Sequence, residues 1–446
     1  MEIQLIEKSR ASVQYFGVAI VCVFFGVAAI FASAKLSFRT PPAVPGLTII
    51  DSPVSTESRE GRLAVFDDVW QTVFDRYYDS SFGGVDWKQQ REHFRPLAGN
   101  AAGTAELYSI LREMVASLRD AHTRVIPPNE NSDWRIPRYI GVGISTRKID
   151  GSDVVVAVEP ESDALRAGIT PGDVVLSVDG NATPLNGGAL TPRSTTATGI
   201  QNIFDGEPES QARIILQNRF GVKSEVKLKR EIRSRNASLM VRSSRHGIAV
   251  MTFDSFTEHV LKQLQDALAI KRRHKRALIL DLRNNGGGDT EVMAAIASIF
   301  LPAGTSLGSF FDREGRISLE PRTAGETALN AHYIQPYEGG LVVLTSRRTA
   351  SAAEIFVSAL RQADRAKQVG EKTCGCVLAI RSTHSLPDGG ALDVSELDYK
   401  TPQGVRLEGQ GIVPEIDVPL SIADIRAGQD RALEMALENL KNSRGK

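Results

Sequence analysis

The chain has 446 residues, of which 42% are hydrophobic and 24% are charged, a composition typical of folded proteins and not of disordered chains. Its 53 basic residues balance its 53 acidic residues, and without a large basic block the sequence gives no reason to expect a nucleic-acid partner. This length is enough for two or three domains of about 100–200 residues each.

The N-terminal segment, residues 1–36, contains an uncharged apolar run over residues 15–34. About 20 such residues span a bilayer as a helix. Lys8 and Arg10 precede the run, so we expect the N-terminus in the cytoplasm and the remaining chain outside it. Because Ala32-Ser33-Ala34 also fits a signal-peptidase site, the segment is either an uncleaved anchor, which its length favours, or a cleaved signal peptide.

Residues 37–60 are rich in Pro, Ser and Thr and predict an extended linker. Residues 61–136 follow and predict a mainly helical region, because apolar side chains recur at helical spacing in two stripes. Thr104 is a candidate N-cap before the second stripe. We interpret the stripes as core packing; they comprise Leu63, Phe66, Trp70, Val73, Phe74 and Tyr77, then Leu107, Ile110, Leu111, Met114, Val115 and Leu118.

Residues 137–232 change to short β patterns separated by glycine-bearing turns. The stretch SDALRAGITPGDVVLSVDG at residues 162–180 resembles the PDZ domains of bacterial proteases. That resemblance implies that the backbone N–H groups of Gly141, Val142, Gly143 and Ile144 bind the terminal carboxylate of a peptide, which adds a strand to the sheet edge. The alternative is a small β domain without a ligand.

Residues 233–420 alternate strands and helices and predict an α/β domain. Residues 277–282 and 341–345 are continuous apolar runs of the kind that form strands buried on both faces. We expect helices over residues 260–270, 291–300 and 352–362, and a closing amphipathic helix in the C-terminal segment, residues 421–446. The fold class is therefore a multi-domain α/β protein.

Two loops that follow the buried strands could carry chemistry. Ser351 lies where a strand leads into a helix, and free backbone N–H groups at a helix start favour developing negative charge. Residues 286–288 are three successive glycines, which allow close approach of a substrate to backbone N–H groups. Taken singly, the serine is more often a helix cap and the glycines a flexible turn.

Together, the segments LILDLRNNGGG, TASAAE, VGEKT and LEGQGIVPEIDV resemble the carboxy-terminal processing protease family, peptidase family S41, in order and spacing. With the PDZ-like stretch, the resemblance covers about residues 60–420 and implies a ClpP/crotonase-like catalytic domain. It implies that Ser351 is the nucleophile. The oxyanion donors would be the backbone N–H groups of Ala352 and Gly287.

The chain departs from the best-known branch of this family, which uses a lysine 25 positions after the serine; that position is Cys376. A serine hydroxyl needs a neighbouring base. The segment SLRDAHTRV resembles the one that supplies a histidine in the tricorn-like and chlamydial branches, which pair it with the serine and a glutamate. This resemblance implies a constellation of His122, Ser351 and Glu408. The alternatives are His384 as a reserve base and, less favoured, Cys376 as a base or nucleophile.

Three cysteines imply no disulfide framework, and we expect Cys374 and Cys376 to be reduced, buried side chains. Asp281, at the strand end, either caps the glycine loop or takes part in the reaction, and Arg283 binds a substrate carboxylate or pairs with Glu354. The sequence shows no metal-ligand cluster, no dinucleotide loop and no cofactor signature, so we expect neither metal nor cofactor.

The expected function is that of a serine endopeptidase, which cleaves exported proteins or peptides near exposed C-termini through an acyl-enzyme, on the extracytoplasmic, periplasmic side of the cell membrane. If the signal were cleaved, the protein would be secreted. The alternative is an inactive scaffold that binds peptides, and a weaker one is the binding of apolar ligands. The sequence does not indicate an oligomeric state.

Overall fold

The structure, a computed structural model, describes residues 53–128, 138–183, 203–204, 206, 208–234, 237–244, 248–271, 277–324 and 336–442. The predicted anchor and most of the predicted linker lie outside these residues. Among the helices of the described part of the chain, none combines the length and the apolar character needed to cross a bilayer.

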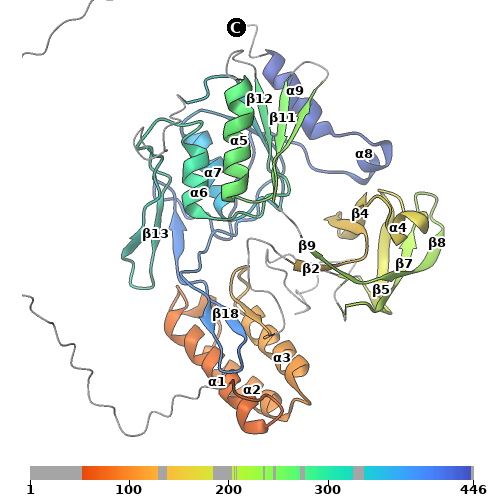
Figure 1. Cartoon of the computed structure of the whole chain (residues 1–446), viewed down its shortest axis with the longest axis vertical. Coiled ribbons are helices and arrows are strands. Elements are labelled where there is room, and N and C mark those ends of the chain that lie inside the picture. Colours follow the sequence, from red (N-terminus) through yellow and green to blue (C-terminus); the bar gives the residue numbers. More distant parts are fainter. Residues whose placement is uncertain are drawn as a thin grey trace, which may run out of the picture. The chain divides into compact units, whose positions relative to one another are not determined.

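Three helices and a short 3₁₀ turn form the N-terminal region (Figure 1). They are α1 (Arg59–Arg76), η1 (Phe82–Gly84), α2 (Trp87–Asn100) and α3 (Thr104–Ala116). The two predicted stripes are largely buried here, which confirms their interpretation as core. Ser58 and Asp86 cap α1 and α2 by accepting backbone N–H groups, whereas the expected cap Thr104 is the first helical residue of α3 and Gly103 is its N-cap.

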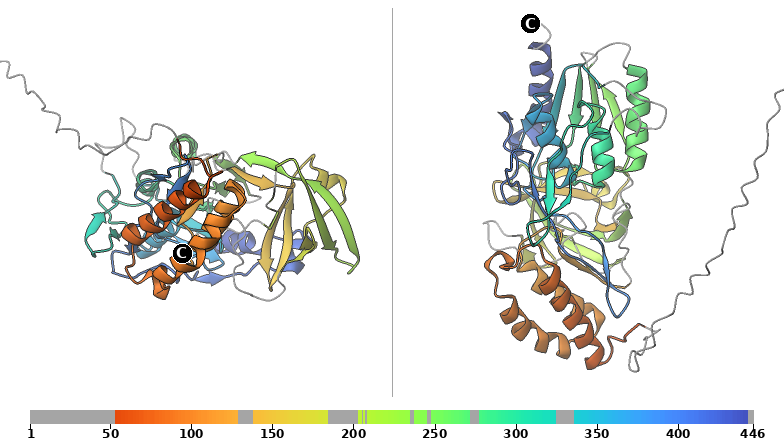
Figure 2. Two further views of the ribbon diagram at one scale, coloured as in Figure 1. Left: turned by 90° about the horizontal axis from the view of Figure 1, so that it is seen from below. Right: turned by 90° about the vertical axis from the view of Figure 1, so that its left-hand side faces the viewer.

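This helical region shares its core with a hairpin from far along the chain. Leu386, Leu392 and Val394 belong to the same buried cluster as the helices, and the views in Figures 1 and 2 place the hairpin against them. The hairpin contributes β17 (His384–Ser385) and β18 (Ala391–Asp393), and β18 pairs antiparallel with β1 (Arg124–Ile126). The segment just before β1 is therefore attached to the C-terminal half of the protein.

A separate antiparallel sheet forms the β domain. Its strand order is β3-β4-β5-β7-β8, with β6 beside β5, so β3 lies at one edge. Its elements are β3 (Ile144–Ile149), β4 (Ser152–Val158), α4 (Asp163–Arg166), β5 (Val174–Val178), β6 (Asn181–Ala182), β7 (Gln211–Gln217) and β8 (Lys223–Lys229). The pair β2 (Arg138–Gly141) and β9 (Glu231–Ser234) joins this domain to the rest of the chain.

The α/β domain contains a six-stranded sheet of order β10-β11-β12-β15-β16-β20, parallel except for the antiparallel edge strand β10. Its strands are β10 (Met240–Ser243), β11 (Ala249–Thr252), β12 (Leu278–Asp281), β15 (Leu341–Thr345), β16 (Lys367–Gly370) and β20 (Ile416–Asp417). Every residue of β12 and β15 is buried, as the two apolar runs predict. The predicted α/β fold of this region is confirmed.

Helices cover both faces of this sheet (Figures 1 and 2). On one face, α5 (Glu258–Lys271), α6 (Thr290–Ala297) and α7 (Ala352–Gln362) pack against alternate strand residues such as Leu280 and Val343. On the other face, α9 (Arg431–Asn442) packs against the intervening residues Ile279 and Val342. This alternation follows from the period of two in a strand.

The C-terminal segment differs from the prediction of one closing helix. It forms α8 (Ile422–Ala427) and α9, because Gly428 adopts a left-handed conformation that ends α8. A third small sheet, β13 (Ser309–Phe311), β14 (Ile317–Leu319) and β19 (Asp398–Lys400), completes the described strands.

Candidate active site

Ser351 lies at a sharp turn between β15 and α7. Its backbone has φ 56° and ψ −129°, a region that non-glycine residues rarely adopt, and α7 begins at the next residue. Such a conformation persists only where surrounding contacts enforce it, and in strand–turn–helix hydrolases it exposes a nucleophile at the top of the sheet. The candidate nucleophile therefore has the backbone geometry that its proposed role requires.

The glycine loop after β12 packs directly against this turn. A Cβ atom on Gly287, whose φ is 107°, would lie 2.7 Å from the Cβ of Ser351 and 3.1 Å from the backbone nitrogen of Ala352. The N–H of Ala350 donates to the carbonyl oxygen of Asn285 at 3.1 Å. The two loops that the sequence singled out are therefore adjacent.

The two predicted oxyanion donors, the N–H groups of Ala352 and Gly287, differ in their hydrogen bonding in this structure. The N–H of Ala352 is the first of α7, where a helix leaves backbone donors without intrahelical partners. The N–H of Gly287 instead donates to Oδ1 of Asn285 at 2.9 Å, and the Asn285 amide is itself fixed by donation to the carbonyl of Phe253. A substrate oxyanion would therefore have to replace Oδ1 of Asn285 as the acceptor of the Gly287 N–H.

Glu354, in the first turn of α7, is completely buried and was not identified from the sequence as a site residue. Its carboxylate accepts the Thr373 hydroxyl at 2.5 Å and the N–H groups of Gly375, Cys376 and Ser351 at 2.7, 2.8 and 3.3 Å. Burial raises the pKa of this carboxyl, and the four donors oppose the rise. The side chain connects the elbow to residues 373–376. Only its position three residues after the serine could have indicated this role.

Cys374 and Cys376 form a disulfide, which contradicts the expectation of reduced, buried thiols. Cys374 is exposed and Cys376 half-buried. Their Cα atoms are 5.3 Å apart, within the usual range for a disulfide, because Gly375 between them takes a left-handed conformation with φ 75°. A side chain at Gly375 would meet the backbone nitrogen of Gly411 at 2.7 Å, so glycine is required there.

Glu408 lies beside the residues that follow this disulfide. One carboxylate oxygen accepts the N–H groups of Val377 at 2.6 Å and Leu378 at 3.2 Å. Burial raises the pKa of Glu408 to about 7; these two donors lower it, and the charge of Asp120 raises it further. Asp120 belongs to the turn before β1 (Arg124–Ile126).

His122 lies in that turn. Asp120 accepts the N–H groups of His122 and Thr123 at 2.8 and 2.7 Å and the hydroxyl of Ser395 at 2.8 Å, which attaches the turn to the segment after β18. Nδ1 of His122 is buried without a hydrogen-bond partner. Burial lowers the pKa of the imidazole, which the charge of Asp120 partly opposes, so burial favours the neutral ring.

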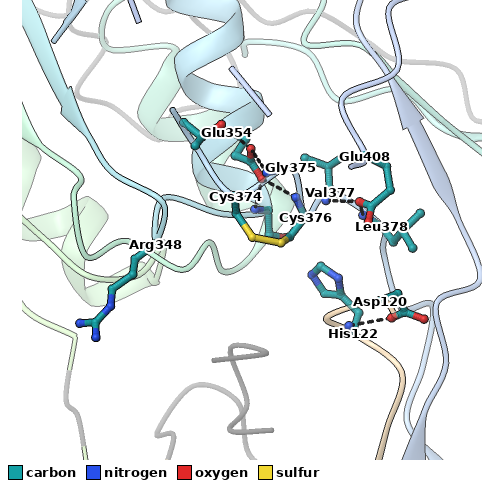
Figure 3. Close-up of a disulfide and its surroundings, with 12 residues drawn as sticks. Asp120, His122, Arg348, Glu354, Cys374, Gly375, Cys376, Val377, Leu378 and Glu408 are labelled. Carbon is teal, nitrogen blue, oxygen red and sulfur yellow. Dashed lines mark hydrogen bonds between the residues drawn. A yellow bond between two sulfur atoms is a disulfide. The ribbon is translucent and has the colours of Figure 1, made fainter. Parts of the chain in front are cut away.

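Residues 376–378 therefore contact two of the three predicted catalytic residues, Ser351 and Glu408. Figure 3 shows the ring of His122 pointing toward the disulfide, with the carboxylate of Glu408 on the neighbouring Val377. The N–H of Ser351 donates to the carbonyl of Cys376 at 2.8 Å. Among the residues that the structure describes, no hydrogen bond joins the His122 side chain to Ser351 or Glu408.

The other candidates have structural partners. Arg283 forms bidentate ion pairs with Asp281 and Asp430, so the alternative pairing with Glu354 is wrong. Nε2 of His384 lies 3.0 Å from a carboxylate oxygen of Glu396. In the described part of the chain, no cluster of three or more His, Cys, Asp or Glu side chains could hold a metal ion.

Two family models match the sequence. The model described as peptidase family S41 matches residues 247–418, and the model of the tricorn protease C1 domain matches residues 58–116. A carboxyl-terminal-processing protease of Synechocystis sp. is 30% identical over 393 residues, which cover 83% of this chain and 85% of that protein. The chain belongs to peptidase family S41. This family places it among the serine proteases.

Other comparisons agree with this assignment. The chloroplastic carboxyl-terminal-processing peptidase 2 of Arabidopsis thaliana is 28% identical over 386 residues, 83% of this S41 chain and 71% of that protein. The crystal structure of mature CPAF shares its fold, with a TM-score of 0.63 at 15% identity over 87% of this chain and 99% of that one. The tricorn C1 match ends before His122, so it does not test the role of that residue.

Proposed function

We propose that this S41 protein is an endopeptidase that cleaves exported proteins or peptides near their C-termini through an acyl-enzyme on Ser351. The observation that carries the proposal is the φ of 56° at Ser351, at a strand–turn–helix elbow whose glycine loop and first helical N–H lie beside it. A serine that merely capped α7 would use ordinary extended backbone angles.

The proposed base is His122. A neutral imidazole accepts the Ser351 proton as the hydroxyl attacks the scissile carbonyl, and it returns the proton to the leaving amine. The lowered pKa of His122 keeps the ring neutral and able to accept a proton. Glu408, when ionised, would orient the imidazole. The mechanism requires the turn at Asp120–Thr123 or residues 374–378 to move, so that the ring reaches the hydroxyl.

The oxyanion would be stabilised by the N–H groups of Ala352 and Gly287. Preorganised donors of this type each contribute about 10²–10³-fold in rate in other serine proteases. In this proposal, substrate binding turns the Gly287 N–H away from Asn285 and toward the developing charge. Peptide hydrolysis then follows when water attacks the acyl-enzyme.

The β domain is the proposed PDZ domain, which would bind the C-terminus of a substrate. Several features support this role. β3 is an edge strand, and the loop before it contains Val142 and Gly143, whose φ is 80°. A cavity of about 80 Å³ beside Val142 is lined by three cationic side chains and three carboxylates, namely Arg166, Lys229, Arg233, Glu161, Asp163 and Glu231. Arg166 is paired with Asp163 and Arg233 with Glu231, so a peptide carboxylate would gain charge-assisted hydrogen bonds there only by displacing these partners.

The proposed location is outside the cytoplasm, with the membrane contacted through residues 15–34. The disulfide between Cys374 and Cys376 supports an oxidising compartment, because cytosolic proteins are normally kept reduced. If the N-terminal segment is cleaved instead, mass spectrometry of the mature protein would show a chain that begins near Lys35.

The test is covalent labelling of the full-length protein with a fluorophosphonate probe. We expect labelling of the wild type, none of Ser351→Ala, and a loss of about 10³-fold in labelling rate for His122→Ala. His384→Ala is the matched control and should label at a rate close to that of the wild type. Absence of labelling under all conditions would support the alternative, an inactive peptide-binding scaffold in which Cys376 replaces the base. Full reactivity of His122→Ala would exclude only the proposed base.

A further inference from the structure

The disulfide between Cys374 and Cys376 has no part in the proposed hydrolysis, although it occupies the position where a related branch of the family carries its lysine. It closes a ring of only three residues. A disulfide stabilises a protein mainly by restricting the unfolded chain, and the effect falls with loop length. This one therefore contributes little to global stability by that route.

The backbone of the ring is attached to both sides of the candidate nucleophile. The N–H of Cys374 donates to the carbonyl of Thr349 at 2.9 Å, and the carbonyl of Cys376 accepts the N–H of Ser351 at 2.8 Å. These two bonds bracket the turn in which Ser351 takes its positive φ. The ring geometry therefore determines where the elbow is anchored.

The same ring also contacts the surroundings of two carboxylates, the buried Glu354 and the half-buried Glu408. The N–H groups of Gly375 and Cys376 donate to Glu354, and the carbonyl of Gly375 accepts the N–H of Gly409, next to Glu408. If the sulfur–sulfur bond opens, Gly375 regains conformational freedom, and all of these contacts become less well defined.

The bond is accessible to a reductant because Cys374 is exposed. Exposed disulfides are the ones that are labile and regulatory, whereas buried structural ones resist reduction. Figure 3 shows the ring of His122, the proposed base, pointing toward the disulfide. A disulfide that anchors the proposed nucleophile is therefore placed where reduction could change its reactivity.

We propose that the Cys374–Cys376 disulfide is a redox modification site that controls the elbow: the oxidised form is the competent protease, and reduction by a dithiol lowers the reactivity of Ser351. This inference rests on the proposed role of Ser351. A thiolate of the dithiol attacks the sulfur of Cys374, and Cys376 leaves as a thiolate that takes up a proton. The second thiol of the dithiol then releases Cys374, so two electrons pass from the dithiol, which becomes a cyclic disulfide.

The experiment uses the full-length Cys22→Ser protein, so that the pair supplies the only thiols. Maleimide labelling counts free thiols before and after dithiothreitol treatment, and the rate of fluorophosphonate labelling is measured in both states. We expect no free thiol before treatment, two after it, and a labelling rate about tenfold lower after reduction, since small displacements of a reacting group cost about that much or more. Reoxidation should restore the rate.

The matched control is the same protein with Cys374→Ser and Cys376→Ser, which should label slowly and be insensitive to dithiothreitol. Equal labelling of the oxidised and reduced forms, faster labelling after reduction, or free thiols in the untreated protein would each overturn the proposal.

Hydrogen exchange of the peptide covering residues 346–356 gives a readout that does not need activity. Reduction should increase exchange there, and unchanged exchange overturns the redox proposal. If no form is labelled while exchange responds to reduction, the proposed hydrolase fails and the redox coupling of the elbow stands.

Discussion

The carbonyl oxygen of Cys376 accepts the backbone N–H of Ser351 at 2.8 Å. In a related branch of the family this position carries the lysine base, whereas in this chain its backbone carbonyl holds Ser351, the proposed nucleophile. The base is then expected from another part of the chain, and β1 pairing with β18 brings His122 to this region. Residues 376–378 contact both Ser351 and Glu408, so the proposed site would be assembled around them.

Gly287→Ala should reduce fluorophosphonate labelling by about 10²-fold or more. The added Cβ would lie 2.7 Å from the Cβ of Ser351 and 3.1 Å from two backbone atoms, none of which is the end of a flexible side chain. The matched control is Gly304→Ala, because Gly304 also has a positive φ of 77° but no atom within 4 Å of its Cβ position. That control should lose only about 1–2 kcal/mol of stability. Equal labelling of both variants would contradict the close packing of the two loops.

Glu408→Gln should change the pH dependence of stability. The pKa of Glu408 is raised from 4.5 to about 7 in the folded protein, mainly by burial. A carboxyl whose pKa is higher in the folded than in the unfolded protein stabilises the fold at pH values below the unfolded-state pKa. This contribution is lost as the pH rises through the folded-state pKa. The glutamine keeps an acceptor for Val377 and Leu378 but does not titrate.

The free energy of unfolding of this variant, relative to the wild type, should therefore increase between pH 4.5 and pH 8 by as much as about 3 kcal/mol. Urea unfolding at the two pH values measures it, and a difference that stays constant would show that Glu408 is not the titrating group. The labelling rate of the wild type should rise as pH passes about 7, if ionised Glu408 orients His122.

Part of this architecture follows directly from the sequence. The strand predicted at residues 341–345 and the helix predicted at residues 352–362 have the observed bounds, because a continuous apolar run and a 3.6-residue period specify them locally. Ser351 and the glycine loop were identified because each follows such a strand, and neighbouring parallel strands end at the same sheet edge.

The remaining features depend on contacts between distant residues. The pairing of Arg124 with Asp393, and the packing of Leu386 and Leu392 against the helices, join segments more than 250 residues apart along the chain and leave no local pattern. The disulfide depends on the left-handed backbone of Gly375, which a Cys-x-Cys spacing does not specify. The four donors around Glu354 are mostly backbone groups, so no residue type indicates them.

Glu354→Ala should destabilise the protein by about 3 kcal/mol or more, because it leaves the Thr373 hydroxyl and the N–H groups of Gly375 and Cys376 without their buried acceptor. Glu291→Ala is the matched control, since Glu291 also lies in the first turn of a helix but is exposed. It should change stability by less than about 0.5 kcal/mol. Thermal and urea unfolding measure both, and similar values for the two variants would refute the buried network.

The ion pair between Arg147 and Glu371 should couple β3 of the β domain to the segment that follows β16. Its atoms are 2.5 Å apart, and the two side chains are only 13% and 18% exposed. A double-mutant cycle with Arg147→Ala and Glu371→Ala should give a coupling free energy of about 1–3 kcal/mol, because the pair is shielded from water. The Arg213–Glu225 pair in the same domain is the control: its side chains are 59% and 40% exposed, so water screens the pair and its coupling should be clearly smaller. Urea unfolding of the four variants in each cycle gives the values, and equal coupling in the two pairs would mean that β3 is not held against the α/β domain by this contact.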